Sequence, residues 1–491
     1  MTVCHQIINF WRIFSGGIAV LAIFFSASPV YATPSLIVDV ASGQVLAEDE
    51  ATASWFPAST TKLMTVYVAL DAVRAGRLTM DTPLMVSPRA ARMAPSKMGF
   101  RPGTEVTLQN ALIMLMVKSA NDIAVTIAEG VSGSVEAFAD DMNRASASLG
   151  MTQSRWVNPN GLPDARQVTS ARDLAILGRA LYTHFPEYAT LFNIGAMQFG
   201  RHIEPNHNGL IGRYPGADGM KTGFTCPAGF NVVASATRGG RHLIVVVLGA
   251  PTAIARTAKA VALFDRGFQT SSGQMSLASL SAPGPADAPD MRNRVCRNRG
   301  AATAEFMAEV ETTPVAMGAT TGVPLFDAVA GAGQATMTPT DVARLPRPHF
   351  QPTQVHIGRV EGYSGPVART RAPGSPIGEG TDLEAYANDT TTPEAEAKPS
   401  KRRLVKKRTP QPAAQEASTE SSPEESREAS VVAPVKRAKN AATKSSKSAT
   451  AIKTSAPSDS TSDNQSTKPT SPKAAKPKPK LSPPTPEGGK Q

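Results

Sequence analysis

The sequence is poor in the residues that build disulfide frameworks, metal sites and aromatic cores. Of its 491 residues, three are cysteine and three are tryptophan, and aromatic residues make up 5% of the chain. No paired cysteines and histidines stand at the spacing of a metal site, so we expect neither a metal nor a cofactor. The chain also lacks a Gly-x-Ser-x-Gly turn, which argues against a Ser-His-Asp hydrolase built on that turn.

Long apolar runs are scarce as well. The N-terminal run, residues 13–25, follows Arg12 and precedes a small-residue stretch that ends at Ala32. A membrane span needs about 20 apolar residues, so this run favours a cleaved signal peptide and leaves a retained anchor as the alternative. No later segment is long and apolar enough to span. We therefore expect export, with cleavage near Ala32.

The C-terminal part has no aromatic residue after Tyr386. Residues 398–491 hold 20 Lys+Arg and 8 Asp+Glu, a net charge of +12 against +11 for the whole chain. Such a segment cannot bury enough apolar surface to fold, so we expect disorder. Its basic charge fits electrostatic attachment to an anionic surface of the cell envelope, and the alternative is a solvated spacer. Nucleic acid is not an expected partner of an exported protein.

Two cysteines remain if the signal peptide, which contains Cys4, is removed. They are Cys226 and Cys296. An oxidising compartment permits a disulfide between them, but the sequence alone leaves open whether they pair.

Three short motifs stand in a fixed order. They are Ser59-Thr60-Thr61-Lys62, Ser119-Ala120-Asn121 and Lys221-Thr222-Gly223. Ser-x-x-Lys and Lys-Thr-Gly each occur once, and the second Ser-x-Asn, at residues 462–464, lies in the polar tail. Together they supply a nucleophile, its base, a second proton carrier and an anion-binding lysine, which is what acyl transfer through a serine ester needs.

Ser59 is expected to begin a helix whose apolar residues recur at helical spacing. Lys62 then lies one turn along on the same face, within reach of the serine hydroxyl. A solvated lysine has a pKa of about 10.4, so Lys62 must be desolvated or lie near another cation, such as Lys221, to act as a base. In the alternative interpretation Ser59 only caps the helix and Lys62 extends along its surface.

Ser119 and Asn121 lie between two predicted helices, 108–118 and 122–129. A hydroxyl and an amide at this junction are suited to carrying a proton and holding a substrate amide. Taken alone, they would more often be helix caps.

A three-stranded hairpin array is predicted at 219–225, 230–236 and 242–248. Gly223 lets the backbone of the first strand approach a substrate closely. A substrate peptide can add to this strand as an edge, with Lys221 and Thr222 holding its carboxylate. Such a site selects a free C-terminus.

A strand at 35–40 with its return at 45–48, the helix after Ser59 and the later hairpin predict an α/β (α+β) enzyme. We expect an antiparallel sheet and a helical subdomain, followed by a largely disordered C-terminal region.

Residues 33–270 resemble the serine-type D-alanyl-D-alanine carboxypeptidases, the low-molecular-mass penicillin-binding proteins of peptidase family S11. The resemblance rests on Pro57–Thr65, Asn158–Pro163, Asn206–Leu210, Asp218–Gly223 and Ala228-Gly229. It implies the penicillin-binding/β-lactamase-like transpeptidase fold. It also implies peptidoglycan stem peptides as substrates, β-lactams as inhibitors, and a periplasmic or cell-wall location.

Carried over to this chain, the resemblance gives Ser59 as the nucleophile and Lys62 as its base. Ser119 relays the proton to the leaving D-alanine, and Asn121 binds the substrate backbone. Backbone N–H groups of Ser59 and Phe224 would meet the oxyanion. Phe224 stands where some relatives have histidine.

Lys221 and Thr222 would hold the substrate carboxylate beside Gly223. Arg256 aligns with a basic residue that assists carboxylate binding in relatives, and the alternative is a surface charge.

The expected division of the chain is a signal peptide (1–32), a catalytic domain (33–270), a low-complexity linker or small poorly defined region (271–395) and a disordered basic tail (396–491). The expected reaction is removal of the terminal D-alanine from peptidoglycan pentapeptides. A D,D-endopeptidase that cleaves cross-links and a wall-binding protein with a vestigial site remain as alternatives. A class A β-lactamase is disfavoured because its Glu-x-x-Leu-Asn pattern is missing.

Overall fold

The computed structural model describes residues 33–273, 275–280, 286–310, 337–372 and 374–378. The signal peptide and the basic tail predicted from the sequence lie outside these residues. Within the described ranges, no helix is apolar over a length that would carry it across a membrane.

A six-stranded antiparallel sheet is the centre of the described fold, in the order β10-β2-β1-β9-β8-β7. Its strands are β1 (Ser35–Asp39), β2 (Gln44–Asp49), β7 (Ala217–Thr225), β8 (Gly229–Arg238), β9 (Arg241–Ala250) and β10 (Met275–Ser276). The predicted N-terminal strand pair and the later three-stranded array are confirmed as β1–β2 and β7–β8–β9. Among the described residues β7 is an edge strand.

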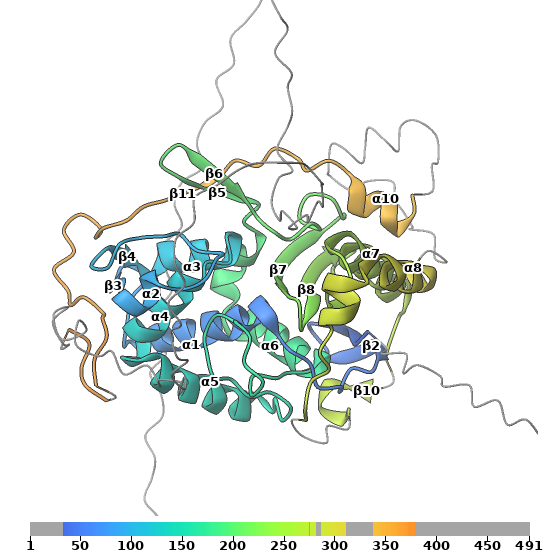
Figure 1. Ribbon diagram of the computed structural model, residues 1–491, viewed down its shortest axis with the longest axis horizontal. Helices are drawn as coiled ribbons and strands as arrows, with labels where there is room; N and C mark the ends of the chain where they lie inside the picture. Colours follow the sequence, from blue (N-terminus) through green and yellow to red (C-terminus); the bar gives the residue numbers. More distant parts are fainter. Residues whose placement is uncertain (1–32, 274, 281–285, 311–336, 373, 379–491) are drawn as a thin grey trace, which may run out of the picture. The chain divides into compact units, whose positions relative to one another are not determined.

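Helices cover both faces of this sheet because its strands alternate apolar side chains between two cores. On β9, Ile244 and Val246 belong to one core and Val245 and Val247 to the other. Figure 1 shows α1 to α5 grouped on one side of the sheet and α7, α8 and α10 on the other. The expected mixed fold with an antiparallel sheet and a helical part is confirmed.

The helices and the remaining strands have the following bounds. The helices are α1 (Lys62–Arg74), α2 (Pro88–Ala91), α3 (Leu108–Val117), α4 (Asn121–Ser132), α5 (Val135–Leu149), α6 (Ala171–His184), α7 (Ala253–Gln269), α8 (Arg299–Val310) and α10 (Pro339–Arg344). Shorter 3-10 turns are η1 (Ala58–Thr61), η2 (Pro186–Asn193) and η3 (Leu277–Ser279), and η4 (Asn293–Arg297) is a π turn. Further strands are β3 (Pro83–Met85), β4 (Glu105–Thr107), β5 (Ala196–Phe199), β6 (His202–Pro205) and β11 (Thr353–Val355).

Helix α1 runs through the larger core with nearly all of its residues buried. The sequence predicted that Ser59 begins this helix, but Ser59 lies in the separate turn η1 and α1 starts at Lys62. Neither η1 nor α1 has a side-chain cap. The alternative in which Ser59 serves as a helix cap is therefore wrong.

Several segments after residue 270 pack on this fold. Helix α10 packs on α7, β11 pairs in parallel with β5, and Ala368 bridges to Leu84 of β3. The linker or poorly defined region expected over 271–395 thus contains ordered pieces, because residues such as Val342 and Val355 are buried in the two cores. The division of the chain at residue 270 stays a prediction.

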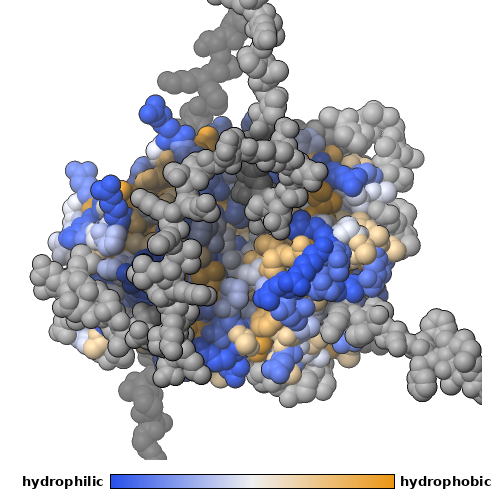
Figure 2. All heavy atoms as spheres, viewed as in Figure 1, coloured by the Kyte–Doolittle hydropathy of each residue, from blue (hydrophilic) through white to orange (hydrophobic). Residues whose placement is uncertain are grey.

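Surface side chains of the coloured residues in Figure 2 are mixed in hydropathy, with apolar and hydrophilic patches side by side. The large apolar side chains that are exposed in the described residues are scattered along the chain: Ile203, Ile254, Met275, Ile357 and Val360.

Arg371 fixes the end of the C-terminal segment to helix α4. Its guanidinium donates hydrogen bonds to the buried carbonyls of Gly130 and Val131, both at 2.7 Å. These carbonyls lie in the last turn of α4, where a cation is favourable. We expect Arg371→Ala to lower the free energy of unfolding by about 1–3 kcal/mol, because the buried carbonyls lose a charged donor.

Urea unfolding of the full chain measures this loss. Arg359→Ala is the matched control, because Arg359 lies in the same segment but pairs with Glu105 at the surface, where an ion pair contributes little. Equal midpoints for Arg371→Ala and Arg359→Ala would contradict the anchoring role.

Candidate active site

Ser59 lies in a tight turn that packs against the edge strand β7 and against the loop at Gly161. Ala58, just before it, has a positive φ of 47°, which a residue with a side chain rarely adopts. A Cβ atom added to Gly161 would lie 1.9 Å from the Ala58 carbonyl oxygen. One added to Gly223 of β7 would lie 2.9 Å from the Ser59 backbone nitrogen. Two glycines therefore make room for the turn.

Lys62 is fully buried one turn after Ser59, and its amine has three partners. Its Nζ lies 2.9 Å from the Ser59 Oγ, 2.8 Å from the Asn121 Oδ1 and 2.6 Å from the Asn160 carbonyl oxygen. Burial excludes the alternative in which Lys62 extends along the surface. A neutral amine has two N–H donors and one lone pair. It can donate to the two oxygen acceptors of Asn121 and Asn160 and accept the proton of the Ser59 hydroxyl.

The surroundings favour this neutral form. Burial lowers the pKa of Lys62 well below its usual value, and the positive charge of Lys221 lowers it further. The carboxylate of Asp122 acts in the opposite direction. Desolvation is the largest of these effects, so it is the fold that favours the neutral amine, the form that has a lone pair to accept a proton.

Ser119 and Asn121 lie at the start of α4, but neither side chain caps that helix. Ser119 has a positive φ of 60°, and its buried Oγ has no hydrogen-bond partner among the described residues. Asn121 is engaged at both ends of its amide: Oδ1 accepts from Lys62, and Nδ2 donates to the Ala94 carbonyl at 2.9 Å. The alternative interpretation of these residues as caps is wrong.

Lys221 and Thr222, in the middle of β7, form a buried basic group with Arg256 of α7. The Lys221 Nζ donates to the Thr222 carbonyl oxygen at 2.9 Å. Burial and the nearby Arg256 lower the pKa of Lys221 to about 7. Burial and Arg347 lower the pKa of Arg256 to about 10. Because Arg256 is only 6% exposed, the alternative interpretation as a surface charge is wrong. Buried cations that lower one another's pKa create a site that favours an anion.

Phe224 follows on β7, next to the turn of Ser59. Its ring stacks on Phe230 of β8 with centroids 4.2 Å apart. The two residues are directly paired in the β7–β8 ladder. The backbone of β7 at this position is thus held by both the ladder and the ring contact.

Three contributors to the site were missed by the sequence analysis. Asn160 supplies a carbonyl to Lys62, Gly161 makes room for Ala58, and Arg347 adds positive charge beside Arg256. The first two lie in Asn158–Pro163, whose Asn-Gly pair between prolines is a turn signal. Arg347 carries no local signal, because only the packing of the C-terminal segment brings it to Arg256.

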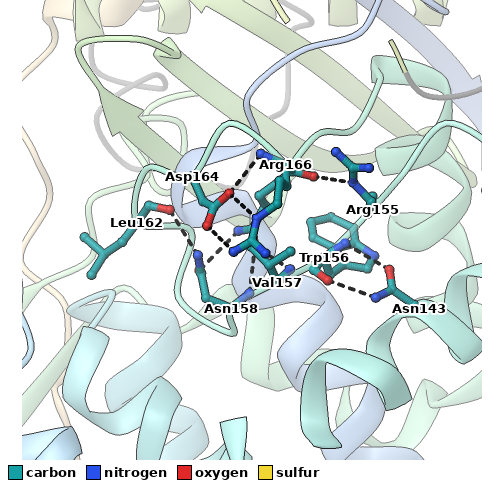
Figure 3. A network of polar contacts seen from close by, with 9 residues as sticks. Asn143, Arg155, Trp156, Val157, Asn158, Leu162, Asp164 and Arg166 are labelled. Atoms are coloured by element: carbon teal, nitrogen blue, oxygen red, sulfur yellow. Dashed lines mark hydrogen bonds and ion pairs between the residues drawn. The ribbon is translucent and has the colours of Figure 1, made fainter. Parts of the chain in front are cut away.

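Figure 3 shows how the loop that carries Asn160 is held. The Asn158 Nδ2 donates to the Leu162 carbonyl, and its Oδ1 accepts from the Gly161 N–H at 2.8 Å. Asp164 binds Arg166 through two hydrogen bonds. The loop is therefore stiffened by its own side chains on both sides of Gly161.

Cys226 and Cys296 are joined by a disulfide. This settles the question that the sequence left open. The bond ties the turn after β7 to η4, outside the region predicted as the catalytic domain.

The chain is similar in sequence to a family of known enzymes. The model of the peptidase S11 family, described as D-alanyl-D-alanine carboxypeptidase, matches residues 24–252. D-alanyl-D-alanine carboxypeptidase DacC of Escherichia coli (strain K12) is 36% identical over 258 residues, which are 50% of this chain and 64% of that protein. DacB2 of Mycobacterium tuberculosis, with the same activity in its name, is 32% identical over 50% of this chain and 84% of that protein.

A crystal structure of penicillin binding protein 5 from Haemophilus influenzae is 34% identical to this chain. The similarity covers 48% of this chain and 71% of that one, with a TM-score of 0.47. The chain thus matches a little less than two thirds of the length of DacC and more of the other two proteins.

Gly161→Ala tests the packing of the Ser59 turn. The new Cβ would overlap the Ala58 carbonyl, and Gly161 has a positive φ of 82°. We expect a loss of more than about 2 kcal/mol of stability and slower acylation of Ser59, because both the backbone and the turn must shift. Chemical unfolding and stopped-flow acylation measure the two effects.

Gly150→Ala is the control, since its φ is 73° but nothing lies within 4 Å of the added Cβ. This variant should lose only about 1 kcal/mol. If both substitutions lowered the free energy of unfolding by the same small amount and left the acylation rate unchanged, the close contact between Gly161 and the Ser59 turn would contribute to neither.

The pH dependence of stability tests the lowered pKa of Lys221. The folded protein has this pKa near 7 and the unfolded chain near 10.5, so between these values the unfolded state binds more protons. The contribution of Lys221 to stability therefore rises with pH from about 7 to 10 and is most unfavourable below 7. We expect Lys221→Met to be more stable than the wild type by about 1–4 kcal/mol at pH 6.5.

This difference should shrink towards pH 10, because the lysine of the folded protein is then neutral and no charge has to be buried. Urea unfolding at the two pH values gives the comparison. If Lys221→Met and the wild type differed in stability by the same amount at both pH values, Lys221 would have an ordinary pKa in the folded protein.

Proposed function

This chain belongs to the peptidase S11 family of D-alanyl-D-alanine carboxypeptidases, and on that premise we propose that it is a serine-type carboxypeptidase that removes the terminal D-alanine from peptidoglycan pentapeptides through an acyl-Ser59 intermediate. One observation carries the proposal. A buried Lys62, with a lowered pKa, lies 2.9 Å from the Ser59 Oγ.

The substrate peptide binds along the free edge of β7 as an added strand. Its terminal carboxylate lies at Lys221 and Thr222, with Arg256 and Arg347 adding positive charge behind them. The buried positions of Lys221 and Arg256 support this role, because a carboxylate there gains strong charge-assisted hydrogen bonds. A substrate that continued past this position would leave the cations unpaired, so a free C-terminus is selected.

Acylation begins when Lys62 takes the proton of the Ser59 hydroxyl. The Oγ attacks the carbonyl carbon of the penultimate D-alanine, and the negative charge moves to the carbonyl oxygen. The backbone N–H groups of Ser59 and Phe224 receive this oxyanion. The close packing of β7 on the Ser59 turn at Gly223 supports the pairing of these two groups.

Collapse of the tetrahedral intermediate breaks the peptide bond. The leaving amine of D-alanine takes a proton, which we assign to Ser119 as the relay from Lys62. The buried Ser119 Oγ, which lacks a partner in the described structure, supports this role. Asn121 holds the amine of Lys62 through its Oδ1 and so orients the base. Asn121 also binds the substrate backbone.

Water then hydrolyses the acyl-serine and restores the enzyme, with Lys62 again able to accept the proton. A β-lactam enters the first half of this cycle, because its strained amide acylates Ser59. Its amine leaving group stays attached to the acyl fragment after ring opening. The acyl-enzyme therefore persists, and β-lactams act as inhibitors.

The protein acts outside the cytoplasm in this proposal. Residues 1–32 direct export, and the mature enzyme works in the periplasm or at the cell wall, where its substrate is found. The disulfide between Cys226 and Cys296 fits an oxidising compartment. The basic tail, 396–491, attaches the enzyme to an anionic surface of the envelope.

Intact-mass spectrometry with benzylpenicillin tests the nucleophile. We expect a persistent adduct of one penicillin on the full mature chain and none on Ser59→Ala, because only the serine hydroxyl can form the ester. Release of D-alanine from a pentapeptide should fall at least about 1,000-fold in the variant.

Thr60→Ala is a suitable neighbouring control, since its hydroxyl is bound to the Pro57 carbonyl. A penicillin adduct on Ser59→Ala would refute the assignment of Ser59 as the nucleophile. Destruction of penicillin without an adduct would indicate a β-lactamase instead.

A further inference from the structure

Ser119, the proton relay in the proposed function, depends on its neighbours for its position. Its φ of 60° is a backbone conformation that a residue with a side chain rarely adopts, and a residue keeps such a conformation only where its surroundings determine it. Its buried Oγ has no hydrogen-bond partner among the described residues. The place of this hydroxyl is therefore set through the backbone, by the contacts that hold the residues next to it.

The loop at residues 94–99 holds the backbone on both sides of Ser119. The Ser96 Oγ donates a hydrogen bond to the Lys118 carbonyl at 2.9 Å. The Asn121 N–H donates to the Ser96 carbonyl at 2.7 Å. Ser96 thus fixes the chain before and after the relay serine, and the side chain of Lys118 is held from elsewhere.

Glu204 of β6 holds the side chain of Lys118. Its Oε2 lies 3.0 Å from the Lys118 Nζ, and the side chains of Lys118 and Glu204 are only 23% and 16% exposed. Charges shielded from water in this way attract each other more strongly than the exposed pairs that contribute little to stability. The ion pair therefore ties the hairpin of β5 and β6 to the residue that precedes Ser119.

Two histidines keep Glu204 ionised. The His202 Nε2 lies 3.0 Å from the Glu204 Oε2, and the His207 Nε2 lies 3.8 Å from the Oε1. The imidazoles of His207 and His202, together with the ammonium of Lys118, lower the pKa of Glu204 to about 2, against the opposing effect of burial. Lys118 therefore faces a carboxylate, and not a neutral acid, at any pH near neutrality.

The same hairpin also contacts the loop that supports Ser119. Phe199 of β5 meets Phe100, just after the loop, edge to face, with ring centroids 5.4 Å apart. On its other side β5 pairs in parallel with β11, which lies beyond residue 252, where the family match ends. Figure 1 shows β11 beside β5 and β6. The hairpin thus bears on both supports of the relay serine, the loop and Lys118.

We propose that Glu204 is a positioning residue for the proton relay: its carboxylate holds Lys118, and Lys118 in turn keeps the Ser119 hydroxyl where it can pass a proton to the leaving amine. This inference rests on the proposed function. In the relay, Lys62 gives the proton taken from Ser59 to the Ser119 oxygen, and Ser119 gives its own hydroxyl proton to the amine. Glu204 exchanges no proton in these steps.

Glu204→Ala tests this role with two substrates that share the same acyl part. One ends in D-Ala-D-Ala, and in the other a thiol acid replaces the leaving D-alanine, so that a thioester is cleaved. An amine must gain a proton as it leaves, whereas a thiol with a pKa of about 8.5 can leave as the thiolate. Only the first substrate therefore needs the relay.

We expect the maximal rate of acylation by the D-Ala-D-Ala peptide to fall about tenfold in Glu204→Ala, a part of the roughly 100-fold or more that a positioned proton carrier contributes. The half-saturating concentration should stay within about twofold, and so should acylation by the thioester. Quenched-flow measurement of leaving-group release gives the rate and the half-saturating concentration separately for the two substrates.

Lys118→Met should reproduce this selective loss, because Glu204 acts only through Lys118. The double variant of Lys118→Met and Glu204→Ala should be no slower than either single variant, whereas two independent supports would multiply their effects. Lys118→Arg, which keeps a cation opposite Glu204, should lose less than about threefold.

His202→Gln is the matched control. His202 contacts the same Glu204 oxygen as Lys118 does, but its side chain is 74% exposed, and no contact of the described residues joins it to Lys118. Both acylation rates of this variant should stay within about twofold of the wild type. Urea unfolding of each variant shows whether its fold is kept.

The outcomes separate this inference from the proposed function. If Glu204→Ala slowed the amide and the thioester equally, or slowed neither, the positioning role would be refuted while the activity stood. If Glu204→Ala did not fold, the same comparison with Lys118→Met would decide. If the wild type released no D-alanine and benzylpenicillin formed no adduct, the proposed function itself would fail, and this inference with it.

Discussion

Burial of the Lys62 amine beside Ser59 is the constraint on which the rest of the site depends. A charged ammonium at this place would have to be desolvated next to other buried cations, so the fold favours the neutral amine. Burial of the amine is offset by three polar contacts, with partners in η1, at the start of α4 and in the loop at Asn160. The same burial that lowers the pKa of Lys62 therefore also requires three separate parts of the chain to meet around its amine.

Residues after 252, which the family model does not cover, pack around this part of the structure. Arg347 adds charge behind Arg256, and Arg371 caps α4, the helix that begins at Asn121. Near the other end of β7, the segment at Asp290 is held by the disulfide to Cys226. Residues that the family model does not cover therefore lie close to β7 both at Arg256 and at the disulfide of Cys226.

Much of the fold could be predicted from the sequence because the relevant signals are local. Alternating and continuous apolar runs gave β1, β7, β8 and β9 within a few residues of their observed bounds. The start of α1 was misplaced by three residues, since a 3-10 turn and an α-helix share the same apolar spacing at their junction. The ordered pieces after residue 270 were missed because they are short and are held by contacts to distant strands rather than by a pattern of their own.

The sequence by itself determined the chemistry that is available: a serine, a lysine three residues later, a second serine with an amide, and a Lys-Thr-Gly strand. The spacing within the first motif also determined that Ser59 and Lys62 meet, because residues three apart lie on one side of a helical turn. Only the tertiary structure decided that the pKa of Lys62 is lowered, that Arg256 is buried, and that Cys226 pairs with Cys296. These properties depend on desolvation and on contacts between residues far apart in the chain, and neither is encoded in any short stretch of it.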